Sequence, residues 1–199
     1  VTPCVAPIAQ PTALSLIAGG TTISGSFTAS ASANGYLVIR TTSATAPTNP
    51  TSGTAYVAGT TALGGTIVQS SSATTFTNSG LSPLTQYWYW VFAYSTGCIG
   101  QPSYLTANAL SGNATTTLNY CTPTDGSGST SYYLNGISTT GGITNLAYTA
   151  SSYTAYVNNS ATTFSAFPGT TINTSLSSSA ADGYWYAWVD WNNNGVLTD

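Results

Sequence analysis

The last ten residues, 190-DWNNNGVLTD-199, have a spacing of oxygen-bearing side chains that suits metal binding. A calcium loop coils around its ion and directs every second side chain inward, and a glycine allows the sharp turn that follows. The predicted ligands are the side chains of Asp190, Asn192, Asn194 and Asp199 and the backbone carbonyl of Val196. With only two carboxylates we expect weak Ca²⁺ affinity, about 10⁻⁴ to 10⁻³ M. The alternative is a strand that ends in an Asn-Gly hairpin turn.

Charged residues are almost missing from the 199-residue chain, which contains no His, Lys, Glu or Met. The five charged side chains are Arg40, Asp125, Asp182, Asp190 and Asp199. Without His or Lys, a Ser or Cys nucleophile has no common base. Acid–base catalysis would depend on four aspartates that lie far apart in the sequence. We therefore predict that the chain is not an enzyme.

The low number of basic residues and the short apolar runs each exclude one kind of partner. One Arg cannot neutralise a row of phosphates, so we expect no nucleic-acid binding. No run approaches the roughly 20 apolar residues that a membrane helix needs, so we expect no membrane insertion. The first residues, VTPCVAP, have no basic or apolar signal region, and we expect them to be a mature or internal start.

The three cysteines are Cys4, Cys98 and Cys121. They form no CxxC pair, which argues against zinc. In a chain so rich in Thr and Ser they indicate an oxidising, extracellular location. An odd count leaves one thiol unpaired or paired outside this chain, and three buried free thiols are the alternative.

Turn signals recur roughly every ten residues between short alternating runs, which predicts an all-β chain. We expect two β-sandwich domains in tandem, over residues 1–117 and 118–199, with residues 111–118 as a small polar linker. A loop over residues 41–53 should cross between sheets. The predicted strands of the first domain lie near residues 12–18, 21–30, 36–40, 66–71, 73–78, 86–94 and 103–110. Those of the second lie near residues 131–138, 143–150, 153–158, 161–166, 170–177 and 183–191.

The strand 86-QYWYWVFAY-94 is unusual because both of its faces are apolar. One face carries Tyr87, Tyr89, Val91 and Ala93, and the other carries Trp88, Trp90, Phe92 and Tyr94. The later strand 183-GYWYAWVDW-191 raises the same question of what covers a second aromatic face.

The segment 80-GLSPLTQYWYWVFAY-94 resembles the fibronectin type III family through Leu81, Pro83, Thr85 and Tyr87. The resemblance implies that Tyr87 forms a tyrosine corner and that its face of the strand lies inside the sandwich. The second aromatic face then points outward. In related bacterial secreted modules a Cys near the start pairs with one after this strand, which implies a Cys4–Cys98 disulfide. Phe27 stands where that family usually has a Trp.

The second half is similar to the GEVED domain of bacterial secreted and surface proteins. The matching features are 120-YCTP-123, Ile137, 141-GGI-143, Tyr153 and 187-AWVDWNNNG-195. The family's acidic signature would follow Asp199, so we expect the natural chain to continue and this domain to be incomplete.

An aromatic face that points outward has three interpretations: it packs on the second module, it contacts a neighbouring subunit, or it stacks on sugar rings. We favour protein contact through Trp88, Trp90, Phe92 and Tyr94. Few charges let subunits approach without desolvating ions. We predict a structural segment of an extracellular bacterial surface protein, in a filament, stalk or layer or as an adhesin. The alternative is a glycan- or protein-binding accessory module of a secreted hydrolase.

Overall fold

The computed structural model describes residues 2–118, 133–154, 157–159, 162–179 and 187–190. Over these residues the chain forms β-strands and no helix, so the predicted all-β fold is confirmed. In the described part no helix is long and apolar enough to cross a membrane. The chain divides into two compact units, and the second spans residues 121–189. The boundary expected at residues 117 and 118 stays a prediction.

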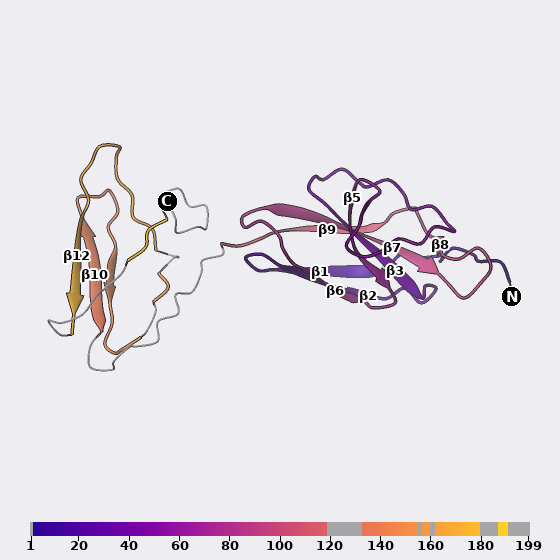
Figure 1. The fold of residues 1–199 in the computed structure, drawn as a ribbon, viewed down its shortest axis with the longest axis horizontal. Helices are drawn as coiled ribbons and strands as arrows, with labels where there is room; N and C mark the ends of the chain where they lie inside the picture. The colour runs from indigo at the N-terminus through magenta and orange to yellow at the C-terminus, as the bar shows by residue number, and fades with distance from the viewer. Residues whose placement is uncertain (1, 119–132, 155–156, 160–161, 180–186, 191–199) are drawn as a thin grey trace. The chain divides into compact units, whose positions relative to one another are not determined.

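The first unit is a sandwich of two antiparallel sheets (Figure 1). The three-stranded sheet has the order β1-β2-β6, formed by β1 (Thr12–Ala18), β2 (Ile23–Thr28) and β6 (Thr75–Asn78). The six-stranded sheet has the order β4-β5-β3-β7-β8, and β9 also pairs with β7. Its strands are β3 (Gly35–Thr41), β4 (Thr61–Ala62), β5 (Gly65–Ser71), β7 (Gln86–Ser95), β8 (Ser103–Tyr104) and β9 (Leu110–Thr115).

The core between the two sheets is rich in aromatic and β-branched side chains, as strand propensity requires. Its buried members are Ile23, Phe27, Tyr36, Val38, Phe76, Leu81, Tyr87, Tyr89, Val91 and Ala93. The four inner residues of β7 therefore point into the core between the sheets, as the predicted tyrosine corner requires. The Ser82 backbone N–H donates a hydrogen bond to the Tyr87 hydroxyl oxygen at 3.1 Å, which confirms that corner.

Three expectations for this unit are wrong. The segment expected as a linker forms β9, because Leu110 and Ala114 pack on the core while Ser111 and Asn113 face outward. The predicted strand 103–110 is interrupted by Asn108, whose φ of 53° lies in the left-handed region. The loop after β3 does not cross between sheets either, since it leads to β4 in the same sheet.

The chain enters and leaves the first unit at opposite ends. The N-terminal residues meet the end of β7, where the Cys4 N–H donates to the Ile99 carbonyl at 2.9 Å. Strand β9 runs antiparallel to β7, and after it the Thr117 N–H donates to the Gly19 carbonyl at 3.0 Å. We call these ends the entry pole and the exit pole. The ten residues of β7 hold them about 30 Å apart.

The described part of the second unit contains a three-stranded antiparallel sheet with the order β11-β10-β12. Its strands are β10 (Leu134–Thr140), β11 (Ala147–Thr149) and β12 (Asn173–Ser178). The central Ile137 stands opposite Tyr148 on one side and Leu176 on the other. Near the expected strand 161–166, the described residues show one isolated bridge, from Thr144 to Ser165. The expected strand 183–191 lies mostly outside the described residues.

Candidate functional site

The outer face of β7 becomes more buried from the exit pole toward the entry pole. Gln86 is exposed, and Trp88 and Trp90 are half-buried. Phe92 and Tyr94 retain only 2% and 7% of their exposure. The aromatic face predicted to point outward is therefore open only over its first half.

The buried half is covered by the first unit itself. A second hydrophobic cluster forms around Leu37, Ile39, Ile67, Phe92, Tyr94 and Tyr104, with Tyr56, Ala62, Leu63, Trp90 and Ala109 packed against it. The ring of Tyr104 lies edge-on to the rings of Tyr94 and Tyr56, at 5.3 and 5.9 Å between centroids. Tyr104 also donates a hydrogen bond to the Thr54 carbonyl at 3.1 Å, which holds the loop between β3 and β4 over the sheet.

The prediction that Phe92 and Tyr94 contact another module or subunit is therefore wrong. Their cover comes from Tyr104 of β8 and from Tyr56 in the loop between β3 and β4. Composition predicts only a polar, proline-bearing loop over residues 41–53. The available signal was Tyr56, an aromatic residue that lies after this predicted loop and before β4. The Thr51 N–H donates to its hydroxyl oxygen at 3.1 Å, so the ring is anchored over the sheet rather than in water.

The two tryptophans lie among polar side chains. Trp90 donates from Nε1 to Thr41 Oγ1 at 3.2 Å, and Thr41 donates onward to the Ser43 carbonyl at 2.8 Å. These bonds fix the edge of the Trp90 indole. On the other flank, Trp88 stands opposite Asn113 of β9, which accepts a hydrogen bond from Gln86 Nε2 at 2.9 Å. We call Trp88 and Trp90 the indole pair.

Arg40 occupies the opposite face of the same sheet. Its guanidinium lies 5.1 Å from the centroid of the Tyr87 ring and donates from Nη2 to Thr66 Oγ1 at 3.0 Å. Its Nη1 donates to Asn78 Oδ1 at 3.3 Å, and Tyr89 donates to the same oxygen at 3.1 Å. Burial raises the pKa of Tyr89 above its ordinary range, and the nearby Arg40 charge offsets part of that rise. The pKa of Tyr104 is raised by burial too. Sequence reasoning had assigned Arg40 no site.

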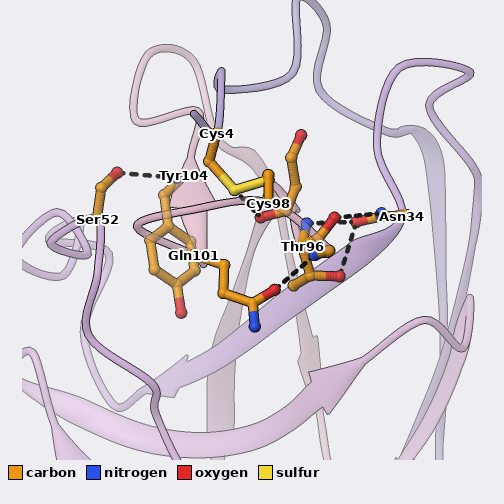
Figure 2. Close-up of a disulfide and its surroundings, with 9 residues drawn as sticks. Cys4, Asn34, Ser52, Thr96, Cys98, Gln101 and Tyr104 are labelled. Atoms are coloured by element: carbon orange, nitrogen blue, oxygen red, sulfur yellow. Dashed lines mark hydrogen bonds between the residues drawn. A yellow bond between two sulfur atoms is a disulfide. The ribbon is translucent and has the colours of Figure 1, made fainter. Parts of the chain in front are cut away.

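The entry pole is closed by the Cys4–Cys98 disulfide, whose Cα atoms lie 4.9 Å apart (Figure 2). The pairing that the family resemblance implied is thus present. Beside it, the Thr96 N–H donates to Asn34 Oδ1 at 2.8 Å, and Asn34 Nδ2 donates to the Thr96 carbonyl at 3.1 Å. These paired bonds join the loop before β3 to the loop after β7. Cys121 lies outside the described residues.

Of the predicted calcium ligands, Asp190 alone belongs to the described part of the chain. The others, Asn192, Asn194, Val196 and Asp199, lie outside it, so the calcium site stays a prediction. Across the described residues, no three His, Cys, Asp or Glu side chains gather into a group that could hold a metal ion. In the aromatic strand expected at residues 183–191, Trp188 is described and is 49% exposed.

Comparison with known proteins finds similarity to solved structures. No family model matches the chain. No curated protein matches it either. Among solved structures, the chain is similar to the fibronectin type-III domain of human fibronectin type III domain containing protein 3. That similarity has 21% sequence identity and a TM-score of 0.35, and it covers 57% of this chain and 88% of that domain.

Proposed function

We propose that the chain is a non-enzymatic structural segment of an extracellular surface protein, in which the first unit acts as a spacer. The observation that carries this proposal is that the chain enters at one pole and leaves at the other. A force that acts on the preceding module is therefore transmitted along β7 and β9 to the module that follows. A module whose ends emerged side by side would add no length.

Both poles are fastened by contacts distant in sequence. The disulfide ties the entry pole across 94 residues, and by loop length such a link stabilises a fold by about 4 to 5 kcal/mol. At the exit pole, the Thr116 hydroxyl accepts from the Thr85 N–H at 2.9 Å. A disulfide in a β-sandwich is compatible with an oxidising, extracellular location.

Exposed apolar side chains at the entry pole support end-to-end contact with a preceding module or a second copy. Val5 is 76% exposed and Ile99 is 62% exposed, and both flank the disulfide. Ile8 is 89% exposed and donates its backbone N–H to Ser32 Oγ of the loop before β3. In a bacterial surface protein such contacts would build a filament or stalk. A layer or an adhesin would use the same spacer.

Electron microscopy of the full chain tests this proposal. We expect end-to-end strings, and we expect the triple change Val5→Ser, Ile8→Ser and Ile99→Ser to disperse them. The matched control is Ile17→Ser with Val57→Ser, since these side chains are 72% and 65% exposed but do not flank the disulfide. Dispersed wild-type particles, or strings that persist in the triple variant, would contradict end-to-end contact at this pole.

A further inference from the structure

We propose that the indole pair on the outer face of β7 is a binding site for an uncharged polysaccharide. This inference does not depend on the spacer function. It rests on the part of the aromatic face that the unit's own loop leaves open. Its members are Trp88, Trp90, Gln86, Ser111, Asn113 and Thr115.

The strand register places these side chains on one surface. Residues directly opposite in an antiparallel pair share a face. Trp90 stands opposite Ser111, Trp88 opposite Asn113, and Gln86 opposite Thr115. The three β9 residues are exposed, and Leu110 and Ala114, which alternate with them, pack on the core. Two indoles about 7 Å apart along β7 are therefore edged by amides and hydroxyls.

The chemistry of this surface fits sugar rings. The face of an indole is electron-rich and attracts the C–H bonds that line one side of a pyranose. The Gln86 amide donates to Asn113 Oδ1. That bond leaves Gln86 Oε1 as an acceptor and Asn113 Nδ2 as a donor, neither with a partner among the described residues. Neighbouring hydroxyls of a sugar can donate to the first and accept from the second.

The size and charge of the surface argue against other partners. Two half-buried indoles expose on the order of 100 Å² of ring, whereas a stable protein interface buries about 800 Å² on each partner. Arg40, the only charged side chain between residues 1 and 118, lies on the other face of this sheet. The site thus offers no ion to an acidic or basic ligand. A neutral, hydroxyl-rich polymer is the partner that matches it.

Affinity electrophoresis of the full chain tests this inference, with gels that contain neutral glucans, mannan, xylan or galactan, and alginate as the anionic comparison. We expect at least one neutral polysaccharide to retard the protein. Trp88→Ala and Trp90→Ala should each weaken retardation roughly tenfold or more. Gln86→Ala and Asn113→Ala should weaken it by roughly threefold to tenfold. These two residues are exposed, so their replacement leaves the fold intact.

The control is Trp188→Ala, which removes an exposed indole from the second unit and should leave retardation unchanged. Near-ultraviolet circular dichroism and the melting temperature would verify folding of every variant. Absence of retardation by all neutral polysaccharides would overturn the inference. So would retardation by alginate alone, or full binding by folded Trp88→Ala and Trp90→Ala variants. A change of oligomeric state in those variants would assign the indole pair to a protein partner and would also overturn it.

Discussion

The Thr116 hydroxyl donates a hydrogen bond to the Ser82 carbonyl oxygen at 2.7 Å, across 34 residues of sequence. The Thr116 hydroxyl oxygen in turn accepts a hydrogen bond from the Thr85 N–H at 2.9 Å, and Thr116 itself is 1% exposed. The residue directly after β9 is thereby fixed to the turn that precedes β7. This latch holds the exit pole closed, as the disulfide holds the entry pole.

The latch predicts a loss of stability when its hydroxyl is removed. Thr116→Val keeps the shape of the side chain but leaves the Ser82 carbonyl and the Thr85 N–H without this partner. We expect the free energy of unfolding of the first unit to fall by about 1 to 3 kcal/mol. Thr117→Val is the control, because Thr117 is exposed, and should change stability by less than about 0.5 kcal/mol. Equal effects of the two changes in urea unfolding would show that the latch contributes nothing.

The aromatic face of β7 predicts stability losses of different size at its covered and open ends. Phe92→Ala empties a site that is 2% exposed and should cost about 3 to 5 kcal/mol of stability. Trp88→Ala removes a half-buried ring at the open end and should cost clearly less. Thermal unfolding of both variants measures the difference. If Trp88→Ala were the more damaging change, the assignment of a covered half and an open half would be wrong.

Alkaline pH should destabilise the first unit through its buried tyrosines. Burial raises the pKa of Tyr89 in the folded state above the value of 10.0 in the unfolded chain. The stabilisation from a neutral Tyr89 is complete below about pH 10 and is lost as pH rises toward the folded pKa. We expect the urea midpoint to fall above about pH 10, with a shallower fall in Tyr89→Phe. A midpoint that stays level up to about pH 11.5, or an equal slope in the variant, would contradict this.

The calcium loop predicted at residues 190–199 can be tested by titration. We expect Ca²⁺ to bind the full chain with a dissociation constant of about 10⁻⁴ to 10⁻³ M. Asp190→Asn should weaken binding further, because it removes one of two carboxylates. Asp125→Asn is the control for general charge. Calorimetry that detects no heat at millimolar Ca²⁺ would favour the hairpin-turn alternative.

The sequence predicted most of the first unit because its local signals agree with one another. The alternation of apolar residues in β7 and the tyrosine at position 87 indicated the inner face, and turn residues marked most strand boundaries. Strand β9 was missed because Ser111, Gly112 and Asn113 are small or polar and are typical of linkers. Its strand character comes from pairing with β7, which is a tertiary contact and leaves little mark on local composition.

The candidate site was predicted in part for a related reason. Strand periodicity established that Trp88, Trp90, Phe92 and Tyr94 share a face. It could not establish what covers that face, since the cover comes from Tyr104 of β8 and from a loop about 40 residues earlier. A loop folds over a sheet through single anchors such as Tyr56, and a single aromatic residue has no periodicity to detect.

Single-molecule force spectroscopy of the full chain, held at its two ends, tests the spacer account most directly. A structural segment must keep its length under load. The disulfide should shield the chain between Cys4 and Cys98, a sequence separation of 94, from extension by roughly 330 Å. We predict that this length appears only after a reducing agent is added. Release of the same length at low force from the oxidised chain would contradict the account.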